Sequence, residues 1–117
     1  MSPEAFDKIC LALPGATLSI QWGNDHVFKV GGKMFAVRGE GVTQGGGVSF
    51  KVSDVAFEVL TETGRAIPAP YLARAKWVQL ADNDILPDAE LAAYLDQAHA
   101  LIAARLTRAA RKDLGLN

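Results

Sequence analysis

The chain has one cysteine, two histidines and no long uninterrupted run of hydrophobic residues among its 117 residues. A single cysteine, Cys10, excludes a disulfide within the chain, and its helical spacing with Phe6 and Leu13 indicates a small buried side chain rather than a reactive thiol. No stretch approaches the roughly 18 apolar residues of a membrane span. Asp7 and Lys8 interrupt the region where a signal peptide needs an apolar segment. We therefore expect a cytoplasmic protein that has no membrane contact.

The sequence also lacks a recognisable catalytic or cofactor-binding constellation. His26 and His99 lie on different expected elements, and neither has a cysteine or histidine at metal-ligand spacing. The glycines of residues 39–47 lead into an expected strand rather than a helix, so they do not form a phosphate-binding loop. The acids at 82–88 lack the spacing of a calcium-binding EF-hand. We expect no enzyme activity, no cofactor and no metal.

Half of the residues are hydrophobic, which is enough to fill one core, so we expect a single domain over residues 1–117. Ser2 and Pro3 favour a helix start, and alternation of apolar and polar residues predicts strands. Strands joined by short turns favour an antiparallel sheet, and two prolines exclude regular structure at 65–71. The fold class is therefore α+β, with N- and C-terminal helices packed on one face of the sheet. The expected order is helix 3–13, strands 17–22, 26–30, 33–38 and 48–52, helix 54–63, strand 76–81 and a helix from about 87 with the buried stripe Leu91, Leu95, Ala98, Ile102 and Leu106.

A tight hairpin at 28–37 is the most informative stretch. Its Gly31-Gly32 pair suits a type I′ turn, because both central positions of this turn need a positive φ. A two-residue turn predicts that Phe28 opposes Phe35 on the face toward the helices, and that Lys29 opposes Met34 on the other face. That outer face is expected to display Lys29, Met34, Ser49, Lys51, Trp77 and Gln79.

The net charge of −1 hides an uneven distribution of charge along the chain. Residues 26–81 hold seven Lys or Arg and four Asp or Glu, whereas residues 82–96 hold five acids and no base. A basic sheet face with an exposed Trp77 suits a phosphate backbone and a stacked base. The alternative is an ordinary solvated sheet face, with Trp77 packed beneath the loop at 68–71.

Two sequence blocks carry a family resemblance: K-V-G-G-K-M-F-A at 29–36, and P-A-P-Y at 68–71 followed by K-W at 76–77. With W-G at 22–23 and V-S-F-K at 48–51, they make nearly the whole chain resemble the MmcQ/YjbR family. The resemblance implies a CyaY-like fold and a "double wing" arrangement for DNA binding, in which hairpin loops flank the duplex. The loop at 39–47 would be one wing tip, although it carries Glu40 and no Lys or Arg.

We therefore predict a small DNA-binding protein that uses the outer sheet face and its loops. Basic side chains are expected to contact phosphates, and aromatic side chains to stack on bases or support the loop. The predicted site residues are Lys29, Lys33, Lys51, Arg74, Lys76, Tyr71 and Trp77. The second hypothesis is a module that binds another protein or a small ligand through an apolar patch of Trp77, Tyr71 and Met34.

Overall fold

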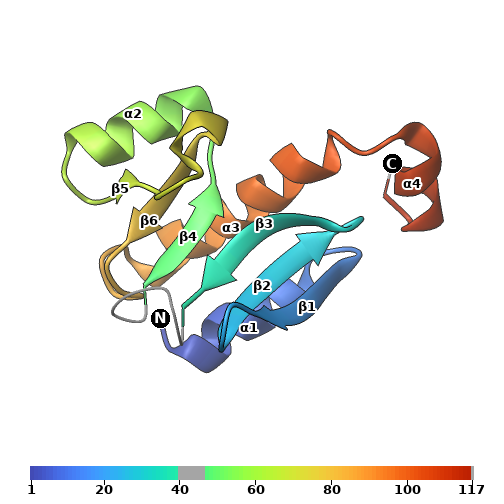
Figure 1. The fold of residues 1–117 in the computed structure, drawn as a ribbon, viewed down its shortest axis with the longest axis horizontal. Helices are drawn as coiled ribbons and strands as arrows, with labels where there is room; N and C mark the ends of the chain where they lie inside the picture. Colours follow the sequence, from blue (N-terminus) through green and yellow to red (C-terminus); the bar gives the residue numbers. More distant parts are fainter. Residues whose placement is uncertain (40–46, 117) are drawn as a thin grey trace.

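A six-stranded antiparallel sheet with helices on one of its faces makes up the fold (Figure 1). The computed structural model describes residues 1–39 and 47–116, so residues 40–46 of the expected wing loop at 39–47 lie outside the described residues. The strand order across the sheet is β1-β2-β3-β4-β6-β5, and every neighbouring pair is antiparallel. The elements are α1 (Pro3–Ala12), β1 (Ala16–Gln21), β2 (Asp25–Val30), β3 (Lys33–Arg38), β4 (Val48–Lys51), α2 (Asp54–Glu62), β5 (Ile67–Pro68), the 3-10 helix η2 (Ala73–Ala75), β6 (Trp77–Leu80), α3 (Asp88–Ala103) and α4 (Arg108–Asp113).

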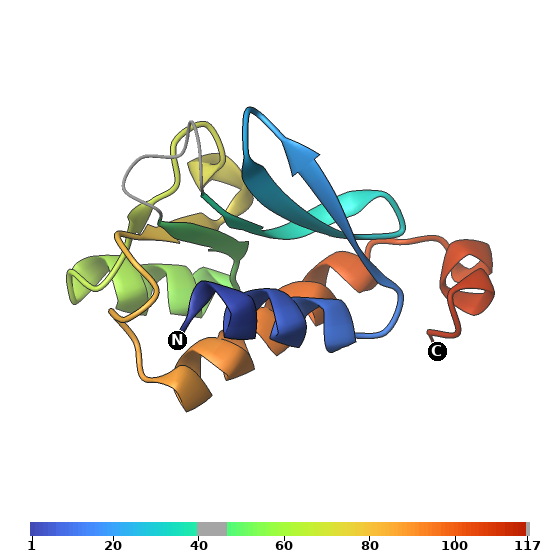
Figure 2. The same cartoon turned by 90° about the horizontal axis from the view of Figure 1, so that it is seen from below.

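The helices and the sheet form two layers, which Figure 2 shows edge-on. Helices α1, α2 and α3 lie on one side, where the main core includes Phe6, Phe28, Phe35 and Phe50. We call the other side of the sheet the open face. The turn between β1 and β2 and the segment 69–76 rise above it. The expected α+β class is confirmed, as is the burial of the apolar stripe predicted for the last helix.

Hydroxyl caps set three of the helix starts. The Oγ atoms of Ser2 and Ser53 accept the N–H of the residue three positions later, at 3.1 Å in each case. Thr107 does the same at 3.0 Å and begins α4, a helix that the basic end of the sequence did not lead us to expect. No helix of the described ranges 1–39 and 47–116 is long and apolar enough to cross a membrane.

The hairpin has the predicted two-residue turn but not the predicted register throughout. Val30 pairs with Lys33, as the turn requires, and both turn glycines have a positive φ. The register then shifts, so Phe28 opposes Ala36 and not Phe35. This β-bulge places two successive residues of β3, Phe35 and Ala36, in the main core. The prediction from strict alternation is therefore wrong beyond the first two pairs.

The sheet edges also differ from expectation. The strand predicted for 17–22 ends at Gln21, and Trp22 begins the turn with a φ of 50°. Leu18 and Ile20 stay exposed although they point to the helix side, because β1 is an edge strand. Ile67 and Pro68 form a short edge strand, where we had expected no regular structure. A proline is tolerated there because an edge strand leaves N–H positions unpaired.

A second, smaller core lies on the open face. Val27, Val37, Ala69 and Trp77 are buried there, and the partly buried Met34 and Leu72 pack against them. Trp77 is only 4% exposed. The segment 69–76 covers it: the N–H of Ala69 donates to the Trp77 carbonyl at 3.0 Å, and the Trp77 N–H to the Leu72 carbonyl at 3.2 Å. The expectation of an exposed Trp77 is therefore wrong, and the alternative, a tryptophan packed beneath this loop, is correct.

The two turn glycines provide a matched pair of substitutions. A Cβ at Gly31 would lie 2.7 Å from two methyl carbons of Leu106, whereas a Cβ at Gly32 would meet nothing within 4 Å. Gly32→Ala should lower the free energy of unfolding by about 1 kcal/mol through backbone strain alone. Gly31→Ala should lower it by about 2–3 kcal/mol, because it adds overpacking against Leu106. Urea denaturation of both variants tests this, and equal losses would contradict the contact.

Candidate nucleic-acid interface

Lys51 lies at the end of β4 and was predicted to contact phosphate, but its side chain is buried. It pairs with Trp77 across β4 and β6, and its Nζ donates to the backbone carbonyls of Val52, at 3.2 Å, and of Ala75. These bonds tie β4 to the segment that covers the open face. The expectation that Lys51 projects freely into solvent is therefore wrong.

Two further cations, Arg105 and Lys76, act on this buried lysine. Burial lowers the pKa of Lys51, and the positive charges of Arg105 and Lys76 lower it further, while Asp54 acts in the opposite direction. Lys76 also places its Nζ 4.8 Å from the ring centroid of Phe57 on α2, within the range of a cation–π contact. The positive charges of Arg105 and Lys76 thus both act on Lys51, and Asp54 is the acid that opposes them. We had not predicted Arg105 as a site residue, because it follows the end of α3 and only the folded chain brings it to Lys51.

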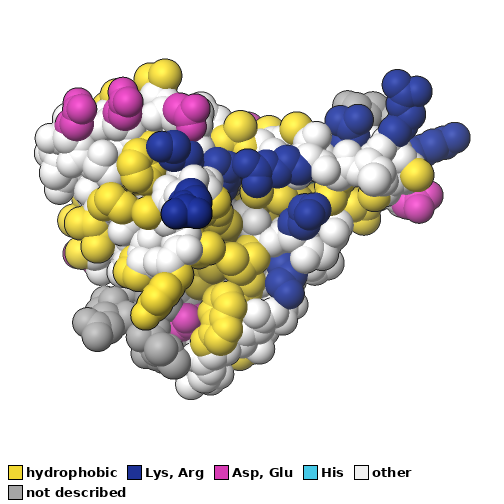
Figure 3. Space-filling model, turned by 45° about the horizontal axis from the view of Figure 1, so that its top comes forward, with side chains coloured by type: hydrophobic (Ala, Val, Ile, Leu, Met, Phe, Trp, Pro, Cys, Tyr) yellow, Lys and Arg dark blue, Asp and Glu magenta, His cyan; other side chains and the backbone are white. Residues whose placement is uncertain are grey.

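The hairpin turn brings a fourth cation to the same end of the sheet. Gly31 lies against Leu106, the residue after Arg105, and the exposed Lys33 is two residues from Gly31. Arg74, in η2, is exposed two residues before Lys76. Figure 3 looks obliquely onto the open face, where Lys and Arg side chains form a band beside a hydrophobic area. We give the name basic band to the cations that the contacts place at or near this end of the sheet: Lys33, Lys51, Arg74, Lys76 and Arg105.

Lys29 flanks the basic band on β2. It is half-buried and lies on the open face, since it follows Val27 by two residues along the strand. The acid Asp25 is on the same side of this strand but is buried. Of the predicted site residues, Lys33, Arg74 and Lys76 thus lie at or near this end of the sheet, and Lys29 lies on the neighbouring strand β2.

Two aromatic side chains are exposed on the open-face side. Tyr71 is 105% exposed and Trp22 is 52% exposed. Tyr71 lies in the segment 69–76 and Trp22 in the turn between β1 and β2, and both segments rise above the open face in Figure 2. The predicted apolar patch of Trp77, Tyr71 and Met34 is not formed as one surface, because Trp77 is buried and Met34 packs against the small core.

A second polar cluster lies on the helix side of the sheet. Arg38 donates from Nε and Nη2 to the two carboxylate oxygens of Asp7, each at 2.8 Å, and His26 Nδ1 is 3.0 Å from Asp7 Oδ2. The cluster joins α1 to β2 and β3, so it fixes the helix on the sheet. Sequence reasoning missed it because its members are far apart in the chain, although the charges on α1 and the end of β3 were visible.

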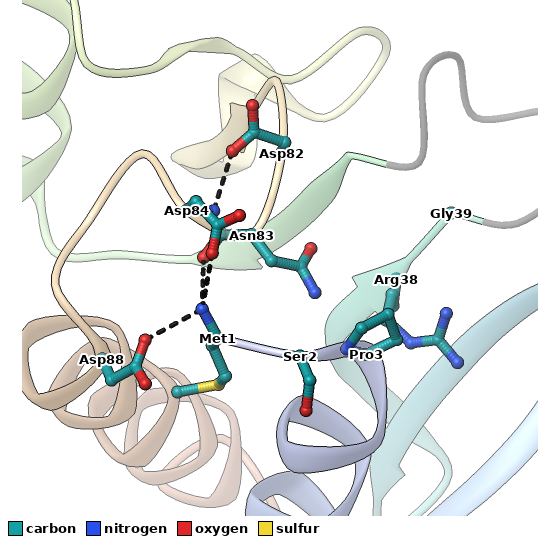
Figure 4. A pocket seen from close by; sticks show the side chains of 9 residues that line it. All are labelled: Met1, Ser2, Pro3, Arg38, Gly39, Asp82, Asn83, Asp84 and Asp88. Atoms are coloured by element: carbon teal, nitrogen blue, oxygen red, sulfur yellow. Dashed lines mark hydrogen bonds and ion pairs between the residues drawn. The ribbon is translucent and has the colours of Figure 1, made fainter.

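A pocket of about 540 Å³ opens beside the start of α1 (Figure 4). Asp82, Asp84 and Asp88 line it, and the Met1 amino group lies 2.8 Å from carboxylate oxygens of both Asp84 and Asp88. No group of three or more His, Cys, Asp or Glu side chains within residues 1–39 and 47–116 is arranged to hold a metal ion. This acidic pocket repels phosphate, so it is not part of the candidate interface.

Fold and surface together define a small α+β domain whose sheet has one helix-covered face and one open face, with cations gathered at one end of the sheet. The model of the YjbR family matches residues 11–101, so the chain belongs to the YjbR family. It is also similar to the crystal structure of Deinococcus radiodurans protein DR2400, described by a DUF419 domain, with 26% identity and a TM-score of 0.82. That match covers 97% of this chain and 88% of that one. No curated protein matches the sequence.

The environment of Lys51 can be tested by its titration. Because burial and the nearby cations lower its pKa, Lys51 should lose its proton at a lower pH than a lysine in an unstructured peptide. Arg105→Gln should raise the pKa of Lys51, since it removes a positive neighbour, whereas Arg108→Gln on α4 should leave it unchanged. NMR titration of isotope-labelled lysine side chains measures both effects. Titration of Lys51 at the pH of a lysine in an unstructured peptide would contradict the arrangement.

Proposed function

We propose that this protein binds DNA through its open face and the adjoining end of the sheet, with the exposed cations of the basic band on the phosphates. The observation that carries the proposal is the buried Lys51 side chain, whose Nζ is held by the carbonyl of Ala75, the residue before Lys76. The positive charges of Arg105 and Lys76 also act on it. Such an arrangement is unfavourable on its own and is relieved when an anion binds. The backbone of DNA carries a regular series of phosphate anions, so it can contact several cations along an extended surface.

The members of the interface have different roles in this proposal. Lys29, Lys33, Arg74 and Arg105 have side chains that can reach phosphate oxygens. Lys51 contributes its positive field from below the surface and holds the covering segment in place. Trp77 supports that segment from beneath and does not contact the ligand. Tyr71 is the aromatic side chain that projects from it.

The proposed role is binding without catalysis, in the cytoplasm. Burial raises the pKa of Cys10, so this thiol is a poor nucleophile and suits a structural position. The double-wing arrangement implied by the family resemblance would add the hairpin turn at 31–32 as one contact. The proposal does not depend on the loop at 40–46.

Removing cations of the basic band should weaken binding and reduce its salt dependence. Arg74→Gln/Arg105→Gln removes two exposed cations, and each lost phosphate contact should lower the slope of log K against log salt concentration by about 1. The control Lys8→Gln/Arg65→Gln removes the same charge, from α1 and from the ion pair of Arg65 with Glu90. Anisotropy titrations of a labelled duplex at several salt concentrations give the slopes. Equal losses in the two variants would show that only net charge matters and would overturn the assigned interface.

A second candidate function is self-association through β1. This edge strand carries no charged residue, and Leu18 and Ile20 are exposed along it. Natural edge strands usually carry a charge, a proline or a bulge that prevents pairing with another chain. Two copies of β1 can pair antiparallel without placing like charges opposite each other, which would join two sheets into one.

This candidate predicts a concentration-dependent dimer. Ile20→Lys should shift the protein to monomer, because a lysine on the edge places like charges across the shared strand pair. Val55→Lys changes an exposed apolar residue on α2 and should leave the dimer unchanged. Light scattering after gel filtration measures the mass. A wild-type protein that stays monomeric at high concentration would exclude this function.

A further inference from the structure

The backbone of the described residues departs from its usual conformations at three non-glycine positions: Trp22, Tyr71 and Lys76 have φ values of 50°, 65° and 62°. All three lie in segments that rise above the open face (Figure 2). A positive φ is unfavourable for a side chain with a Cβ, and such strain collects at functional sites. The strained positions therefore lie in segments on the open-face side, and Lys76 is itself a member of the basic band.

Tyr71 occupies a position where glycine is strongly preferred. The Leu72 N–H donates to the Ala69 carbonyl at 3.1 Å, which closes a turn with Pro70 and Tyr71 as its central residues. Proline at the first central position and a positive φ at the second define a type II turn, and the second position favours glycine or asparagine. The tyrosine ring is fully exposed, so burial of its side chain does not offset the strain.

Trp22 shows the same combination at the start of the turn between β1 and β2. It has a positive φ, is followed by Gly23 with a φ of 90°, and leaves half of its surface in solvent. A large aromatic side chain in this backbone conformation is an outlier. Two strained turns that rise above the open face thus each carry an exposed aromatic residue, and neither ring belongs to the two buried cores.

We infer that Trp22 and Tyr71 are stacking platforms for unpaired bases, and that the ligand of the open face is single-stranded nucleic acid. This inference rests on the proposed function and makes it more specific. Bases of a duplex are already stacked and expose only their edges, whereas unpaired bases stack on exposed aromatic rings beside a basic surface that follows the backbone. The basic band supplies the phosphate contacts, and the two rings supply the base contacts.

The test compares three labelled ligands: oligothymidylate, oligouridylate and a DNA duplex. Each is about 12 nucleotides or base pairs long, which is within the usual range of binding-site sizes for a small domain. At one low salt concentration, wild-type protein should bind a single strand about tenfold more tightly than the duplex. Tyr71→Asn and Trp22→Asn keep a residue that tolerates a positive φ but remove the ring. Each should weaken single-strand binding about tenfold without lowering the melting temperature. Tyr71→Phe should bind like wild type, and so should Val55→Ala, which removes exposed apolar surface on α2.

Tryptophan fluorescence gives an independent readout. Since Trp77 is buried, quenching by added oligothymidylate should come from Trp22 and disappear in Trp22→Asn. Equal affinity for single strand and duplex, with both ring variants binding like wild type, would overturn the stacking inference and leave the proposed function intact. Absence of salt-sensitive binding to all three ligands would overturn the proposed function as well. Binding to oligouridylate alone would support stacking and replace DNA by RNA as the partner.

Discussion

The burial of Trp77 between the sheet and the segment 69–76 determines what the open face displays. The indole fills the small core with Val27 and Val37, and the backbone bonds of Trp77 to Ala69 and Leu72 hold the segment over it. Once this segment is fixed, Lys51 is enclosed beneath it and Tyr71 is pushed outward at its tip. One packing contact therefore decides which of the predicted site residues lie inside the molecule and which lie on its surface.

Enclosing Lys51 has an electrostatic consequence. A lysine removed from water and placed near Arg105 and Lys76 has a charge that is partly satisfied by carbonyl dipoles rather than by carboxylates. The low local polarity that lowers its pKa also strengthens its field at the surface above. The buried lysine thus favours an anion on the open face without touching it, and the exposed cations around it can make the direct contacts.

Local sequence patterns predicted the elements well where a single physical rule dominates. The hydroxyl cap at Ser2, the glycine pair at 31–32 and the stripe of the last helix each specify one structure. The same rules fail where packing between distant segments decides. The bulge at Phe35 depends on what the core can accept, and alternation alone cannot show it. Trp77 and Lys51 were assigned to the correct face. Alternation could not show whether they are exposed, because their burial depends on how the segment 69–76 packs over β4 and β6. Arg105 was missed for the same reason.

In the proposed function, the two sides of the sheet divide stability from recognition. On the helix side, buried phenylalanines and the bonds of Asp7 to Arg38 fix α1 and the central strands in low-strain geometry. On the open face, positive-φ residues, closely spaced cations and exposed rings coincide. Each of these features costs free energy in the isolated chain, and a rigid, well-packed opposite face is what allows the fold to tolerate them. An anionic ligand with flat, apolar bases would offset both costs at once, by neutralising the cations and by covering the rings, whereas a purely ionic or a purely apolar partner would offset only one.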